Sequence, residues 1–150
     1  MIRSEIVLTI PGTPAPKGSL RCRRNPAHTL YEDNPRTKPW RDKVADAARR
    51  IQQTPDKGQP LDVEITFTFD RPKSVKRDLP ASRSVGDVDK LVRTVLDALQ
   101  DGGALLDDAQ VTDVSARKRY VRLDDQDTPL TLRYDDALGY PGVVIRINPI

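Results

Sequence analysis

Two pairs of aspartates have the spacing of a metal-binding site. Asp87 and Asp89 stand at the expected start of a helix, and Asp107 and Asp108 follow a glycine pair, just before an expected strand. At the N-cap the backbone is not yet helical, so the Asp87 carboxylate can converge with that of Asp89. If the glycine turn returns Asp107 or Asp108 to the helix start, three carboxylates meet around one hard cation such as Mg²⁺.

Such a site would suit phosphodiester hydrolysis. Mg²⁺ keeps several waters beside one or two carboxylates, and it can polarise a phosphoryl oxygen while lowering the pKa of a bound water. The alternative is structural: Asp87 and Asp89 would cap the helix and complement its dipole, which is worth about 0.3 to 2 kcal/mol. The Asp107-Asp108 pair would then be an ordinary turn.

Arg93 has the same two interpretations. It lies four residues after Asp89 and four before Asp97, so it can form two ion pairs on the helix surface, each worth a few tenths of a kcal/mol. It can instead bind the phosphate beside the metal carboxylates, where negative charge develops during hydrolysis. The spacing supports both.

Other chemistries do not match these residues. A phosphatase Asp-x-Asp motif follows a hydrophobic strand, whereas a basic loop precedes Asp87. Lys90 and Leu91 break the pattern of a calcium loop. With one histidine and one cysteine in the chain, neither a zinc site nor a Ser-His or Cys-His hydrolase can be built.

Charge is segregated along the chain although the net charge is only +3. Residues 15–43 and 70–86 are mainly basic, and residues 87–113 are rich in aspartate, which suits a cation site beside a phosphate-attracting surface. Solvated surface charge is the alternative explanation. The side chains expected to contact DNA are Lys17, Arg21, Arg23, Arg24, Arg71, Lys73, Lys76, Arg77 and Lys90.

The elements that must position these residues follow from periodicity and from turn residues. Strands are expected at 5–10, 61–69, 110–121 and 143–148, and helices at 37–53 and 87–100. Trp40 lies on the apolar stripe of the first helix, which favours core or interface over base stacking. Basic loops, expected to be flexible, occupy 11–34 and 70–86, and a polar segment occupies 122–140. This order predicts an α+β fold with a mixed sheet and two helices packed on one face.

Length and composition favour one intracellular domain. The 150 residues fit a single domain, with 37% hydrophobic and 31% charged residues. The lone Cys22 and an N-terminus without a secretory pattern predict a cytoplasmic location. The apolar runs are far shorter than the roughly 20 residues that span a bilayer, so no membrane role is expected.

Three linked motifs resemble the RusA family of Holliday junction resolvases. They are Asp87-Val88-Asp89-Lys90 at a helix start, Asp97-Ala98-Leu99 later on that helix, and Leu106-Asp107-Asp108-Ala109-Gln110-Val111 after the glycines. In the family the corresponding blocks are D-x-D-N, D-A-L and D-D-A-Q-V. The resemblance covers residues 60 to 120 well, and the N-terminal part more loosely.

The resemblance implies a homodimer that cuts four-way DNA junctions by paired symmetric incisions. It implies Mg²⁺ as cofactor, with Mn²⁺ as a possible substitute, and no nucleotide cofactor. The family's essential carboxylates carry over to Asp87, Asp89 and Asp108, with Asp107 a less certain neighbour. Members often come from phages and prophages.

Two departures from the family pattern affect the site. Lys90 replaces the family asparagine, and Arg93 stands where the family has a lysine. A planar guanidinium keeps the charge but not the geometry of an ammonium, so the role of Arg93 is open. A nuclease acting more broadly on flaps and forks is one alternative function, and a protein that binds structured DNA without cutting it is another.

Overall fold

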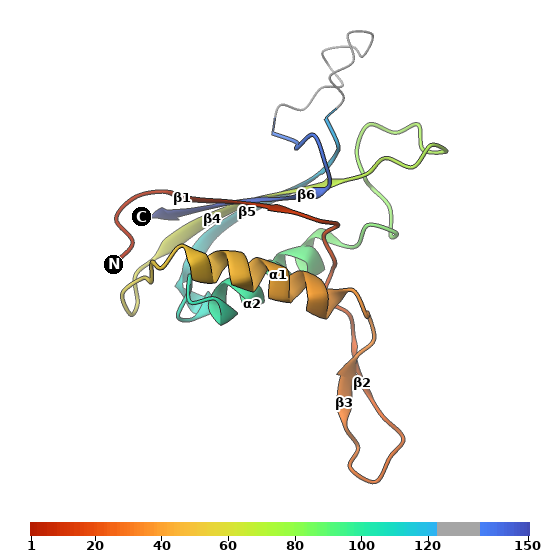
Figure 1. The fold of residues 1–150 in the computed structure, drawn as a ribbon, viewed down its shortest axis with the longest axis horizontal. Helices are drawn as coiled ribbons and strands as arrows, with labels where there is room; N and C mark the ends of the chain where they lie inside the picture. The colour runs from red at the N-terminus through yellow and green to blue at the C-terminus, as the bar shows by residue number, and fades with distance from the viewer. Residues whose placement is uncertain (123–135) are drawn as a thin grey trace.

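The computed structural model describes residues 1–122 and 136–150, and it consists of a mixed sheet with two helices on one face (Figure 1). The sheet order is β1-β6-β4-β5, with β4 and β5 parallel and the other neighbours antiparallel. The sheet strands are β1 (Ile6–Pro11), β4 (Leu61–Phe69), β5 (Val111–Tyr120) and β6 (Gly142–Pro149), and the helices are α1 (Thr37–Arg50) and α2 (Val88–Asp101). The predicted α+β architecture is confirmed.

The core lies between the sheet and the two helices. The sequence of β4 alternates between apolar and polar residues, and its apolar side chains face the helices because successive side chains of a strand point to opposite faces. Each fully buried large side chain contributes about 1.5 to 3 kcal/mol. The main contributors are Leu61, Val63, Ile65, Phe67, Val143, Ile145 and Ile147 from the sheet and Trp40, Val44, Leu91, Val95 and Leu99 from the helices. Trp40 is therefore a core residue, as predicted.

Glycines set the start and the end of α2. Gly86, at φ +96°, precedes the N-cap, and a Cβ there would lie 2.8 Å from the ring of Pro16. Gly102 ends the helix where α1 and α2 touch, since a Cβ would lie 2.5 Å from the backbone oxygen of Ala45. Both positions thus exclude a side chain, and together they fix how α2 sits against the rest of the fold.

Two element boundaries differ from prediction. α1 ends at Arg50 and not at 53, because Gln52 adopts a left-handed φ of +52° that cannot continue a helix. A 3₁₀ turn, η1 (Asp108–Gln110), precedes β5, so this strand begins at Val111. Residues 70–86, all of which are described, contain no helix or strand, as predicted; of the polar segment 122–140, residues 123–135 lie outside the described part.

The predicted loop 11–34 is wrong in part, because it contains a β-hairpin. β2 (Leu20–Cys22) pairs antiparallel with β3 (Leu30–Glu32), and the hairpin projects away from the sheet and helices (Figure 1). All three side chains of β2 are exposed. A strand with no buried face shows no apolar alternation, so periodicity could not reveal it.

None of the helices within the described residues is long and apolar enough to span a membrane.

Candidate nuclease site

The start of α2 presents two aspartates to solvent. Asp87 is the N-cap residue, but its side chain accepts no capping hydrogen bond; it is 62% exposed, and the nearest charge is the Lys90 ammonium at 3.9 Å. Asp89 lies in the first turn and is exposed, and its carboxylate has no hydrogen bond or ion pair with any described residue. Side-chain capping therefore does not account for Asp87 or Asp89.

The two residues of the second aspartate pair differ in their side-chain contacts. Asp107 caps η1, accepting a hydrogen bond from the Ala109 N–H at 2.9 Å within a capping box completed by Gln110. The Gln110 amide donates to the backbone oxygens of Asp56 and Gln59, which ties the turn to the chain before β4. Asp108 is exposed and makes no side-chain contact with the described residues. Of this pair, Asp108 is the one whose carboxylate has no hydrogen bond or ion pair with the described residues.

The structure does not bring Asp87, Asp89 and Asp108 together within one chain, which corrects the predicted convergence. Among the described residues, no three His, Cys, Asp or Glu side chains lie close enough to hold a metal ion. The 14 residues of α2 separate the two pairs, and a helix of that length spans about 21 Å. The glycine turn leads into β5 at the far end of α2 and does not return to its start.

What does return to the start of α2 is Lys118, near the end of β5. It stands opposite the buried Phe67 in the sheet register, and its ammonium donates to the Gly86 oxygen at 3.0 Å. This contact places a half-buried cation directly before Asp87. The sequence analysis missed Lys118, although a lysine at an inward-facing position of a strand was a possible signal.

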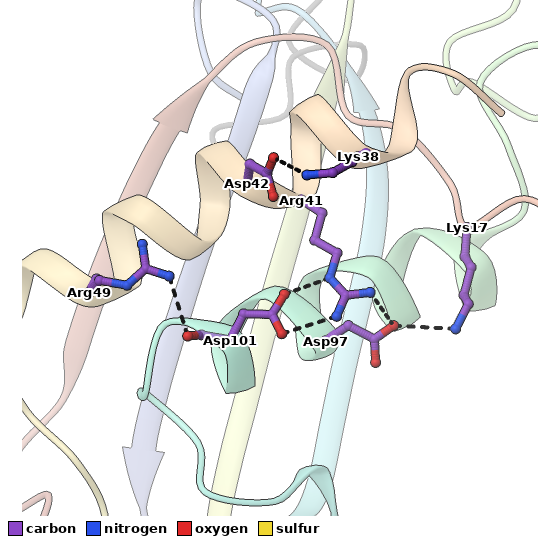
Figure 2. A network of polar contacts seen from close by, with 7 residues as sticks. All are labelled: Lys17, Lys38, Arg41, Asp42, Arg49, Asp97 and Asp101. Carbon is purple, nitrogen blue, oxygen red and sulfur yellow. Dashed lines mark hydrogen bonds and ion pairs between the residues drawn. The ribbon is translucent and has the colours of Figure 1, made fainter. Parts of the chain in front are cut away.

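The ion pairs predicted for Arg93 do not form. Arg93 is exposed on α2, and the carboxylate of Asp97 is instead 3.4 Å from the Lys17 ammonium and 3.6 Å from the Arg41 guanidinium (Figure 2). Lys17, from the N-terminal loop, and Arg41, from α1, therefore pair with Asp97 in place of Arg93. The exposed guanidinium of Arg93 remains free for a phosphate.

The same network binds Asp101 at the end of α2. Arg41 donates to its carboxylate through Nε at 2.6 Å and through a terminal nitrogen at 3.0 Å. Figure 2 shows this bidentate contact between the helices. The hydrogen bond from Arg41 holds the pKa of Asp101 below its ordinary value of 3.8, against the opposing effect of partial burial. Asp97 and Asp101 therefore join the helices.

The predicted DNA contacts fall into two groups. Some have partners within the fold: Arg21 is bound to Asp33 at 2.9 Å, Arg23 lies over the Tyr31 ring, and Arg71 lies over the Tyr120 ring and donates to the Arg77 backbone oxygen. The bond from Arg21 lowers the pKa of Asp33 and raises that of Arg21. Lys17 and Lys90 form ion pairs with Asp97 and Asp87, and Arg77 donates to the Ala81 backbone oxygen. The remaining three predicted contacts are exposed and form no hydrogen bond or ion pair with the described residues: Arg24, Lys73 and Lys76.

Comparison with known proteins identifies one family. The family model described as endodeoxyribonuclease RusA matches residues 11–125, which include both basic segments, α2 and both aspartate pairs. No curated protein matches the chain.

Proposed function

Because the chain belongs to the RusA family of endodeoxyribonucleases, we propose that it resolves four-way DNA junctions as a magnesium-dependent homodimer. Membership makes the protein a hydrolase of DNA phosphodiester bonds and implies a Holliday junction substrate. The structural observation that carries the rest is the state of its aspartates. Asp87, Asp89 and Asp108 lack strong partners, whereas other carboxylates nearby are bound within the fold.

Exposed carboxylates without strong partners fit a hard divalent cation. Asp87 and Asp89 would hold Mg²⁺ through oxygen atoms and leave coordination positions for water and for the substrate phosphate. When bound, the ion would polarise the phosphoryl oxygen and lower the pKa of the attacking water. Mn²⁺ takes the same oxygen ligands and is the expected substitute.

Asp108 can complete this site only from a second copy of the chain. If two α2 helices pack antiparallel across a two-fold axis, the start of each lies beside the η1 turn of the other. Exposed apolar side chains at both ends of α2 and on the neighbouring strand β5 support such an interface: they are Val88, Leu106 and Val114. A two-fold dimer then has two equal sites, which matches the symmetry of a four-way junction.

The remaining side chains would bind and orient the substrate. Arg93 lies one turn beyond Asp89, and its planar guanidinium can take two phosphate oxygens at once. Lys118 holds the Gly86 carbonyl and so fixes the turn that carries Asp87. Phosphate contacts farther away come from the hairpin and from the 70–86 loop, and they supply affinity without sequence readout. The predicted contacts there that have no hydrogen bond or ion pair with the described residues include Arg24, Lys73 and Lys76.

A subunit-mixing experiment tests the shared site. Asp89→Asn and Asp108→Asn chains are each expected to be inactive alone. In a mixed dimer, one site combines both substitutions, and the other combines intact Asp87 and Asp89 with an intact Asp108. Co-refolded mixtures should therefore nick a four-way junction in Mg²⁺, on one strand per dimer.

The matched control mixes Asp87→Asn with Asp89→Asn, which leaves no intact site in any dimer. If the first mixture is as inactive as the control, the shared site is wrong. Rates on flap and linear duplex DNA test the substrate: cleavage of all three substrates at equal rates would contradict junction resolution.

A further inference from the structure

A cleft separates the base of the β2–β3 hairpin from the first turn of α2. Its volume is about 560 Å³, and Asp87 lies in its wall. Ser19 and Asn34 line it from the hairpin side, and Arg83 and Lys90 line it from the α2 side. Any strand that passes from the hairpin to Asp87 must cross this cleft.

The two walls are held at a defined separation. The Lys17 N–H donates to the Lys90 backbone oxygen at 3.1 Å, and Thr37 Oγ1 donates to the Pro16 oxygen at 2.7 Å. On the other side, Pro16 packs against Gly86 so closely that a side chain there would clash. The cleft is therefore a built feature of the fold.

Lys17 belongs to this framework, although its charge suggested a phosphate contact. Its ammonium lies 3.4 Å from Asp97, which also receives Arg41, and Figure 2 shows it directed at the middle of α2. The side chain is only 30% exposed. Although Lys17 also lines the cleft, a phosphate there would have to compete with Asp97 for its ammonium.

Arg83 differs from Lys17, whose charge is paired within the fold. It lies in a turn closed by the bond from the Gly86 N–H to the Arg83 oxygen, and its side chain is exposed without a hydrogen bond or ion pair to any described residue. Asp33, the other acid of the cleft, is already bound by Arg21 and by the Ser19 N–H. Arg83 and Lys90 then face Asp87 alone, so the cleft is already net positive, and it becomes more so once Asp87 holds a cation.

We propose that this cleft binds one phosphate of the DNA strand next to the cut site, and that Arg83 is its main ligand. A guanidinium matches phosphate geometry through two parallel hydrogen bonds, and the Ser19 hydroxyl and Asn34 amide are further donors. Lys17 shapes the cleft without contacting the phosphate. This inference rests on the proposed function.

Binding of a labelled four-way junction in Ca²⁺, measured by anisotropy over a range of salt concentrations, tests the assignment. Arg83→Ala should weaken binding about three- to tenfold and reduce the salt slope by about 1, the effect of one lost phosphate contact. Arg83→Lys should keep most of the slope. Arg50→Ala, an exposed arginine in the last turn of α1, is the matched control and should change affinity less than about twofold.

Lys17→Met tests whether Lys17 supports the wall of the cleft or binds the phosphate. It should leave the salt slope unchanged, and a spin label on Cys22, the only cysteine, should become more mobile as the hairpin loses its anchor. If Lys17→Met lowers the slope and Arg83→Ala does not, the assignment is overturned. If the wild type cuts junctions while Arg83→Ala binds like Arg50→Ala, only this inference fails; if the wild type does not bind DNA, the proposed function fails with it.

Discussion

The two ends of α2 carry the same residue type in opposite states. Asp97 and Asp101 are bound by Lys17 and Arg41, so their charge is satisfied inside the protein. Asp87 and Asp89 are exposed, and the one ion pair that they form with the described residues is that of Asp87 with Lys90 at 3.9 Å. An aspartate with partners holds helices together, whereas an aspartate without them, beside a second carboxylate, has charge available for a cation. Under the proposed function, the contrast separates structural from chemical acids on one helix.

Asp89→Asn gives the largest expected effect and tests the chemical side of this contrast. Cleavage of a four-way junction in Mg²⁺ should fall by at least about 100-fold, because a charged ligand is lost from the reacting centre. Binding in Ca²⁺ should be retained, since the fold does not use this carboxylate. Cleavage products resolved on a denaturing gel are the measurement. Wild-type cleavage by the variant would place Asp89 among the surface charges.

Lys118→Met should have the next largest effect. Without the bond to the Gly86 oxygen, the turn that presents Asp87 is less restrained, and a displacement of this kind costs kcat about 10- to 100-fold. Junction affinity in Ca²⁺ should change little. Lys43→Met, an exposed lysine of α1, is the matched control. A loss of affinity with unchanged kcat would instead make Lys118 a DNA contact.

The sequence predicted the layers of the fold because they depend on local periodicity. Alternation in β4 and the apolar stripe of α2 identified both elements to within a residue or two. The hairpin escaped detection because the side chains of β2 are exposed on both faces. Its strands are held by their mutual pairing and by Asp33, which bonds to the Ser19 N–H and to Arg21. Such contacts produce no periodic pattern in the sequence.

The site was predicted as residue types but not as geometry. The motifs pointed to Asp87, Asp89 and Asp108 as candidate ligands, and a helix was predicted between the two pairs, but the sequence could not show that the glycine turn leads into β5 at the far end of this helix of about 21 Å. The pairing of Asp97 with Lys17, 80 residues away, was equally out of reach, and i,i+4 spacing offered Arg93 as one possible partner of Asp97. Local rules fail where partners arrive from distant segments, and here those partners decide which acids are free.

Asp101→Asn gives the smallest expected effect and tests the structural side of the contrast. The pair with Arg41 is partly exposed, so its loss should lower the free energy of unfolding by only about 0.5 to 1 kcal/mol, measured in urea at neutral pH.

The same variant has an expected pH dependence. The pKa of Asp101 is lower in the folded than in the unfolded chain, so the stability that Asp101 contributes is present above its unfolded-state pKa and is lost as the pH falls through its folded-state pKa. The variant should therefore lose less stability than the wild type when the pH falls below about 4. Asp42→Asn, which removes an exposed pair with Lys38 on α1, is the matched control and should change the free energy of unfolding at neutral pH by less than Asp101→Asn does. Equal acid dependence in the Asp101 variant and the wild type would mean that the Arg41 contact adds nothing to stability, and the distinction between the two ends of α2 would then depend on Asp97 alone.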